Sequence, residues 1–133
     1  MPSKSPEPAN RRRILIVDDD DLMLTFYRSL FSRYESEFSP FFEETGEGAL
    51  LQLKTSWFDA AILDWDMPRL SGLSILKAIR ANPDTRGMQV IMISGHAEFA
   101  DRARALKSGA DDFLAKPFEV ETLLARLRAP FRH

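Results

Sequence analysis

Cysteine is absent from the 133 residues, and long hydrophobic runs are absent as well. The lack of cysteine excludes disulfide bonds and thiolate metal sites, but it is compatible with any cellular compartment. The lack of long apolar runs excludes a membrane-spanning helix, which needs about 20 apolar residues in succession. After the arginines at 11–13, the chain is apolar only over residues 14–17 before a run of acids begins. This run is too short for the core of a signal peptide, so we expect a cytoplasmic location.

A large excess of either charge is also missing. The formal net charge is -2, and acidic and basic residues are spread along the chain. This balance argues against direct binding to nucleic acid or to a membrane by charge alone. The length and a hydrophobic content of 44% fit one domain with its own core. We expect a disordered, proline-containing tail at 1–12, the domain at 13–129 and a short C-terminal end at 130–133.

Short apolar runs alternate with amphipathic segments. The predicted strands cover residues 14–17, 41–43, 60–63, 90–93 and 113–115, and the predicted helices cover about 21–34, 46–53, 71–81, 98–108 and 119–129. This alternation predicts an α/β fold, with a doubly wound parallel sheet and helices on both faces. Pro40 indicates that the second strand lies at an edge, because proline cannot donate to a central ladder.

Four consecutive aspartates separate the first strand from the first helix. Asp20 or Asp21 can cap this helix, and helical spacing is expected to turn Leu22, Phe26 and Leu30 toward the core, with Phe31 a further candidate. Residues 18 and 19 then stand at the end of the strand. Two carboxylates about 4 Å apart repel by roughly 4 kcal/mol at an effective dielectric constant near 20, so they need a positive partner or contact with water.

Other strands also end in polar residues. Asp64, Ser94 and Lys116 follow the third, fourth and fifth strands. Ligands of open parallel sheets bind outside the carboxyl ends of the strands, so these side chains and Asp18 and Asp19 are expected at one site. Carboxylates suit Mg²⁺, which prefers oxygen ligands. A carboxylate beside the metal, best placed at Asp64, can attack a phosphoryl donor, while Lys116 and Ser94 contact the phosphoryl oxygens.

Five stretches of the chain also match a known family. They are Ile-Leu-Ile-Val-Asp-Asp-Asp at 14–20, Ile-Leu-Asp-Trp-Asp-Met-Pro at 62–68, Ser-Gly-Leu at 71–73, Val-Ile-Met-Ile-Ser-Gly at 90–95 and Gly-Ala-Asp-Asp-Phe-Leu-Ala-Lys-Pro-Phe at 109–118. In this order and at these separations they are highly specific. The chain resembles the receiver (phosphoacceptor) domain of two-component response regulators over roughly residues 13–129.

The resemblance implies a flavodoxin-like (βα)5 fold with strand order 2-1-3-4-5. It implies Mg²⁺ as cofactor and phosphorylation of Asp64 by a sensor histidine kinase or a histidine phosphotransfer protein. Such a domain catalyses only its own phosphorylation and dephosphorylation. By position, Asp19 would bind the metal directly, Asp18 would act mainly through water, and the backbone carbonyl of Asp66 would complete the site, with Asp64 also among the metal residues. The peptide bond before Pro117 is expected to be cis.

The resemblance also implies a switch and an output surface. Ser94 would move toward the phosphoryl group and Phe113 would turn inward, changing the surface of the fourth helix, fifth strand and fifth helix for an unknown output domain or target protein. Arg102, Asp112 and Arg126 form a possible dimer face on this surface. The expected state is a monomer or a weak, phosphorylation-dependent dimer.

Several alternatives remain open at this level. Asp66 and His96 can modulate the site, or each can be an exposed loop side chain. The motif at 64–66 also resembles the Asp-x-Asp nucleophile of haloacid-dehalogenase-type phosphatases, although Asp18 and Asp19 then stand on the wrong side of it in the chain. A third interpretation is a pseudo-receiver that binds partners without phosphorylation. The complete set of acids, hydroxyl and lysine argues against that interpretation.

Overall fold

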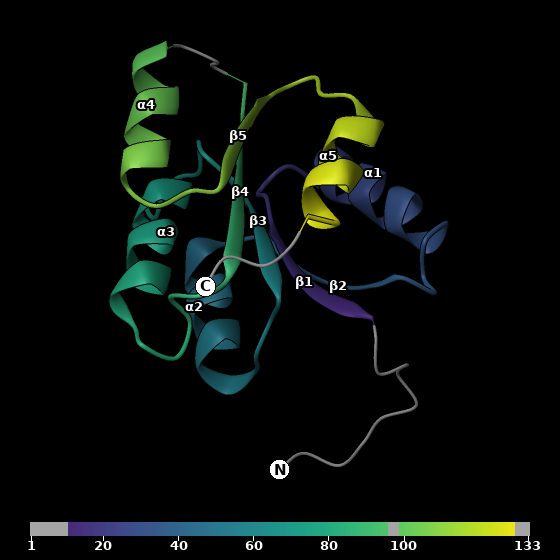
Figure 1. Cartoon of the computed structure of the whole chain (residues 1–133), viewed down its shortest axis with the longest axis horizontal. Helices are drawn as coiled ribbons and strands as arrows, with labels where there is room; N and C mark the ends of the chain where they lie inside the picture. Colours follow the sequence, from purple (N-terminus) through teal and green to yellow (C-terminus); the bar gives the residue numbers. More distant parts are fainter. Residues whose placement is uncertain (1–10, 96–98, 130–133) are drawn as a thin grey trace.

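Five parallel strands form the centre of the molecule (Figure 1). The computed structural model describes residues 11–95 and 99–129. In chain order the elements are β1 (Arg12–Val17), α1 (Asp21–Ser32), β2 (Phe38–Glu43), α2 (Gly46–Thr55), β3 (Ala60–Asp64), α3 (Gly72–Ala81), β4 (Gln89–Ser94), α4 (Phe99–Lys107), β5 (Asp112–Ala115) and α5 (Val120–Leu127). The sheet order is β2-β1-β3-β4-β5, with every neighbouring pair parallel. The predicted flavodoxin-like fold and strand order are confirmed.

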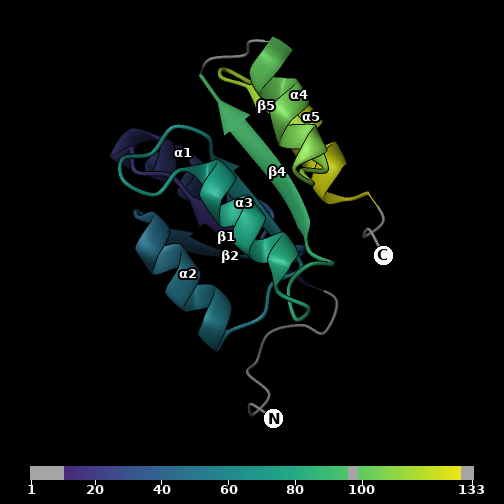
Figure 2. The same ribbon diagram turned by 90° about the vertical axis from the view of Figure 1, so that its left-hand side faces the viewer.

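Helices cover both faces of the sheet. Helices α1 and α5 lie on one face, and α2, α3 and α4 lie on the other (Figures 1 and 2). Successive side chains of a strand point to opposite faces of the sheet, so each strand contributes side chains to two cores. In β1, Ile14 and Ile16 pack with residues of α1 and α5, whereas Leu15 and Val17 pack with those of α2 and α3. This explains the continuous apolar runs within β1, β3 and β4.

Strand β2 lies at an edge of the sheet, as Pro40 predicted. The strand is longer than expected, because it begins at Phe38 and includes Pro40 within its pairing with β1. The remaining elements agree with the predicted segments to within a few residues. Within the described ranges, no helix combines the length and the hydrophobicity that crossing a membrane would take.

The buried side of α1 differs from the prediction. Leu22 is 80% exposed and Phe26 is 38% exposed, while Leu24, Tyr27 and Phe31 are buried together with Leu30. Asp20 caps the helix by accepting a hydrogen bond from the backbone N–H of Leu22 at 2.9 Å, so the first turn begins at Asp21. Spacings of three and four residues put 24, 27 and 31 on one stripe, which packs in the core with residues of β1 and α5, and leave 22 and 26 on its outer flank. The prediction that Leu22 and Phe26 face the core was wrong.

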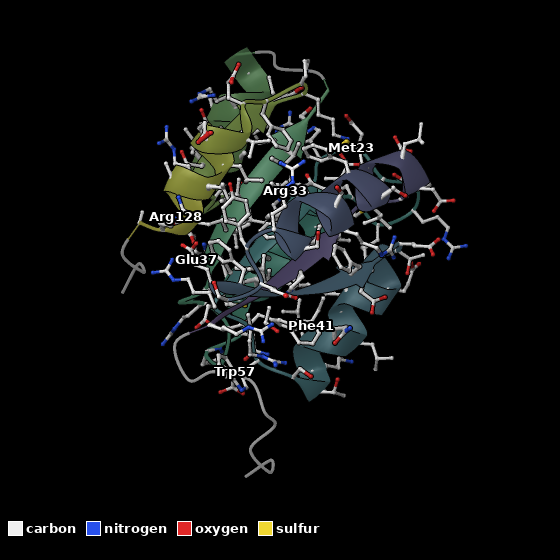
Figure 3. All side chains as sticks on the ribbon, turned by 90° about the vertical axis from the view of Figure 1, so that its right-hand side faces the viewer. Met23, Arg33, Glu37, Phe41, Trp57 and Arg128 are labelled. Carbon is white, nitrogen blue, oxygen red and sulfur yellow. The ribbon has the colours of Figure 1, made fainter. Side chains whose placement is uncertain are left out.

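The amino end of β1 is anchored by aromatic residues. The guanidinium carbon of Arg13 lies 4.3 Å from the centre of the Phe41 ring and 5.1 Å from that of Trp57. Its Nε also donates a hydrogen bond to the backbone oxygen of Trp57 at 2.9 Å. These contacts stabilise one end of the sheet, and the predicted site lies at the other end. Trp57 is labelled in Figure 3.

Candidate functional site

The parallel register brings the predicted site residues to one rim of the sheet. Val17 is opposite Leu63, so the residues that follow them, Asp18 and Asp64, end neighbouring strands. Ser94 is opposite Ala115 in the β4 and β5 pair, which places Lys116 directly beyond this register. The structure therefore gathers side chains from β1, β3, β4 and the turn after β5.

Three carboxylates and one ammonium group form the centre of the site. Carboxylate oxygens of Asp18, Asp19 and Asp64 all lie within 4.8 Å of one another. Asp18 and Asp64 are only 1% and 4% exposed, whereas Asp19 is exposed. Lys116 Nζ lies 3.4 Å from Asp18 Oδ2 and 3.4 Å from Asp64 Oδ1. The lysine therefore bridges the two buried acids, and the third acid stands at the solvent side.

Backbone N–H groups orient the two buried carboxylates. Asp18 Oδ1 accepts a hydrogen bond from the N–H of Asp20 at 2.9 Å. Asp64 Oδ1 accepts a longer one from the N–H of Asp66 at 3.4 Å. Each acid thus bonds to the turn that follows its own strand. The turn after Asp18 also starts α1, because Asp20 is the cap of that helix.

The electrostatics of the site favour an added cation. Burial, and to a lesser degree the nearby charge of Asp18, raise the pKa of Asp64 to about 7 against the opposing charge of Lys116. Burial also raises the pKa of Asp18, against the hydrogen bond from Asp20 and the charge of Lys116. Burial alone would lower the pKa of Lys116, but Asp64 and Asp18 outweigh it and the net shift is upward. Three carboxylates thus face one ammonium group, and this set of hard oxygen donors fits Mg²⁺.

The other predicted residues take the following positions. Ser94 is fully buried at the end of β4, and its backbone oxygen accepts a hydrogen bond from the N–H of Lys116 at 2.7 Å. Phe113 is 1% exposed. The peptide bond between Lys116 and Pro117 is cis. The side chain of Asp66 is exposed. His96 lies outside the described residues.

The residues of the possible dimer face bond within the chain. Arg126 Nε lies 3.0 Å from Asp112 Oδ1, so these two predicted interface partners already form an ion pair in one molecule. Arg102 donates from Nη1 to the backbone oxygen of Phe113 at 2.9 Å, which connects α4 to β5. An intermolecular pair would have to replace the internal pair of Asp112 and Arg126.

Two aromatic side chains near the site were not predicted to take part. Tyr27 is buried below it and stacks on Phe118, with ring centroids 6.3 Å apart and an interplanar angle of 19°. Burial raises the pKa of Tyr27, and the charges of Asp18 and Asp64 raise it further. Trp65, directly after Asp64, packs edge-on against Phe113. Helical spacing from Leu24 could have indicated Tyr27, whereas no local pattern links Trp65 with Phe113, 48 positions later in the chain.

The family model for the response regulator receiver domain matches residues 14–128. The chain belongs to this receiver domain family. Among its relatives, the phosphate regulon transcriptional regulatory protein PhoB of Escherichia coli (strain K12) is 36% identical over 121 residues, which cover 91% of this chain and 52% of that protein. The receiver domain therefore spans about half the length of the relatives that it matches. This membership makes it a signalling domain and does not support the phosphatase interpretation.

Solved receiver domains have the same architecture. The receiver domain of the Francisella response regulator 1452 superposes with a TM-score of 0.80 at 31% identity, covering 88% of this chain and 93% of that one. The receiver domain of the sensor histidine kinase PA1611 from Pseudomonas aeruginosa PAO1 has a TM-score of 0.79 at 27% identity, covering 88% and 94%. That second structure has a magnesium ion coordinated in its active site cleft.

Proposed function

We propose that this receiver domain takes a phosphoryl group onto Asp64 in a Mg²⁺-dependent reaction, from a sensor histidine kinase or a histidine phosphotransfer protein. The observation that carries the proposal is the cluster of Asp18, Asp19 and Asp64, with Lys116 Nζ 3.4 Å from Asp18 Oδ2 and from Asp64 Oδ1. Asp19 and Asp64 would hold the ion directly, Asp18 through water, and the carbonyl of Asp66 would complete its ligands. When bound, Mg²⁺ neutralises charge on the phosphoryl oxygens.

Asp64 is the nucleophile in this proposal. One oxygen of its carboxylate forms a bond to phosphorus while the bond between phosphorus and the histidine nitrogen of the donor breaks. The bonding electron pair goes to that nitrogen. The pKa of about 7 means that a substantial fraction of Asp64 carries a proton near neutral pH, and a cation in the site favours the ionised form that can attack.

Lys116 and Ser94 would act on the transferred group. Lys116 is already within 3.4 Å of Asp64 Oδ1, and its raised pKa keeps it protonated. It can therefore pair with a phosphoryl oxygen as that oxygen replaces Asp18 or Asp64 as its partner. The Ser94 hydroxyl, at the end of the neighbouring strand, supplies a hydrogen-bond donor. If the Ser94 hydroxyl and the Phe113 ring reoriented together, the surface of α4, β5 and α5 would change. This surface is the proposed output surface.

An apolar surface beside Lys116 suits a protein donor. A hollow of about 430 Å³ is lined by Met23, Phe26, Lys116, Pro117 and Phe118. Phe26, which lines the hollow, is exposed on α1, as is Leu22, the residue before Met23. Met23 is labelled in Figure 3. A helix of the donor that covers these side chains would place its histidine near Lys116 and hence near Asp64.

A donor comparison tests this surface. We expect Phe26→Ser to slow phosphorylation by a histidine phosphotransfer protein that reacts with the wild type, by about tenfold, because interface aromatics often contribute 1–2 kcal/mol or more. Phosphorylation by acetyl phosphate should be unchanged, since this small donor needs no helix surface. Leu51→Ser, on the exposed side of α2, is the matched control. Equal slowing with both donors would show that the substitution disturbs the site itself.

Phosphorylation by acetyl phosphate tests the reaction. With Mg²⁺, the protein should gain one phosphoryl group that is stable to acid and labile to alkali, as intact mass can show. Asp64→Asn should gain none. Asp66→Asn keeps its backbone carbonyl and should still be modified, which makes it the control for loss of a nearby charge. Modification that persists in Asp64→Asn would contradict the assignment, and no modification of the wild type would favour a pseudo-receiver.

A further inference from the structure

Trp65, the residue after the proposed phosphoacceptor, lies against the buried aromatic residue of β5. The ring centroids of Trp65 and Phe113 are 5.7 Å apart and the rings are inclined at 77°, an edge-to-face contact. Phe113 is fully buried, and Trp65 is partly buried against the same core cluster. Such contacts are typically worth about 0.5–1.5 kcal/mol beyond the burial of area.

The main chain of Trp65 is held on two sides. Its N–H donates a hydrogen bond to the backbone oxygen of Ile93 at 2.8 Å, which attaches it to β4. Its carbonyl accepts one from the N–H of Gly72 at 3.3 Å, at the start of α3. The indole therefore extends from a well-anchored backbone. A rearrangement of the turn after Asp64 has to move this ring or break these bonds.

Phe113 is connected onward to α4. Its backbone is opposite Met92 in the pairing of β4 and β5. Its carbonyl accepts the hydrogen bond from Arg102 Nη1. A change in the position of Phe113 therefore reaches both β5 and the guanidinium group of an α4 residue.

We propose that Trp65 is a positioning residue that couples the state of Asp64 to α4, through its contact with Phe113 and the bond from Arg102. The proposal rests on phosphorylation of Asp64. Close-packed interiors respond to a local change by moving between discrete arrangements, because they have little empty space to absorb it. Phe113 has no hydroxyl group, so ring contacts alone determine its position. Trp65 supplies the aromatic partner, and it connects directly to Asp64 without the Ser94 hydroxyl.

Amide NMR spectra with and without Mg²⁺ and beryllofluoride, a phosphoryl mimic, test the coupling. In the wild type, addition of the mimic should shift amides at Asp66, at Ser94 and in α4. In Trp65→Leu, the shifts at Asp66 and Ser94 should remain, while those in α4 should fall to about half or less, because the coupling contact is removed. Trp65→Phe keeps a ring and should restore most of the α4 response.

Trp57→Leu is the matched control, because Trp57 is 59% exposed and contacts Arg13 at the opposite rim of the sheet. It should respond like the wild type. If Trp65→Leu does not fold, Phe113→Leu removes the other ring and should reduce the α4 shifts in the same way.

The outcomes separate this proposal from the proposed function. Full α4 shifts in folded Trp65→Leu or Phe113→Leu, with normal shifts at Asp66 and Ser94, would overturn the coupling alone. An equal loss in Trp57→Leu would overturn it too, since the effect would not depend on the ring contact. A wild-type protein with no shift at Asp66 or Ser94 would contradict the phosphoacceptor function and the coupling that rests on it.

Discussion

Asp64 holds its carboxylate in surroundings where ionisation costs free energy. The side chain is buried beside the charge of Asp18, and Lys116 is the cation that contacts both. Burial and Asp18 raise the pKa of Asp64 to about 7. The residue that is proposed to react is thus also a source of instability in the metal-free protein.

This cost predicts a dependence of stability on pH. The pKa of Asp64 is about 7 in the folded protein and near 3.8 in an unfolded chain, so the folded state binds the proton more tightly. The free energy of unfolding should therefore fall as pH rises from about 4 to about 7 in EDTA. Asp64→Asn cannot ionise and should exceed the wild type by about 1–3 kcal/mol above that range.

Urea unfolding of both proteins at the two ends of this pH range measures the difference in free energy of unfolding between Asp64→Asn and the wild type. The advantage of Asp64→Asn should be small at the acidic end and grow toward the basic end, even though the variant weakens one partner of Lys116. A constant difference across the range would show that the shifted proton does not belong to Asp64.

Asp19 is the exposed acid of the cluster and is expected to be a direct metal ligand. Mg²⁺ at about 10 mM should raise the melting temperature of the wild type by a few degrees, because it binds the folded state and relieves repulsion among the carboxylates. Asp19→Asn should lose most of this rise. Asp21→Asn, also exposed but in the first turn of α1, should keep it. A full thermal shift in Asp19→Asn would remove Asp19 from the ligands.

At the scale of single elements, α3 starts in direct contact with the end of β3. A methyl group added at Gly72 would collide with the backbone oxygen of Asp64 and press on the side chain of Met92. The absence of a side chain therefore lets the helix approach the phosphoacceptor strand closely.

Gly72→Ala is expected to be destabilising for this reason. Overpacking of this kind costs about 1–3 kcal/mol, and helix propensity offsets only part of it. Gly87→Ala is a suitable control, because no atom lies within 4 Å of the position that its added carbon would occupy. Thermal unfolding of both variants should separate them, and equal melting temperatures would show that α3 can shift without loss.

The elements could be predicted from the chain to different degrees. The strands were predictable because parallel strands buried on both faces are continuous apolar runs, as at 60–63 and 90–93. The inner side of α1 was not predictable, because Leu22 and Phe26 are as hydrophobic as Leu24 and Tyr27. Both sets have helical spacing, and packing against the sheet and α5 determines which of them is buried.

The site was predictable for a related reason. Asp64 ends its strand and Asp18 and Lys116 directly follow theirs, and parallel topology brings such ends together. The contact of Trp65 with Phe113 and the internal pair of Asp112 with Arg126 depend on the packing of side chains from separate elements. Residue type and spacing contain little information about such contacts.

At the scale of the whole molecule, the surface of α4, β5 and α5 is the expected site of dimerisation. Because Arg126 already pairs with Asp112, exchange for the same pair between two molecules gains little free energy; exposed pairs contribute about 0–1 kcal/mol. We predict a monomer without phosphorylation and at most weak dimerisation with Mg²⁺ and beryllofluoride.

Sedimentation with and without the mimic measures the fraction of the protein that is dimeric. Arg126→Glu should abolish whatever dimer the mimic induces, and Arg28→Glu, on the exposed side of α1, should not. A tight dimer of the free protein that survives Arg126→Glu would place the interface on another surface.

The internal position of β1 in the sheet has a consequence for synthesis of the chain. Strand β1 is made first, yet its two neighbours in the sheet are β2 and β3. The ribosome must reach Glu43 before one side of β1 can pair and Asp64 before the other can. Until then the apolar residues Ile14 to Val17 have no sheet partner on the nascent chain. Chaperones protect exposed apolar segments of this kind during that period. The four aspartates that follow keep this exposed run short and flank it with charge, as residues that limit aggregation do.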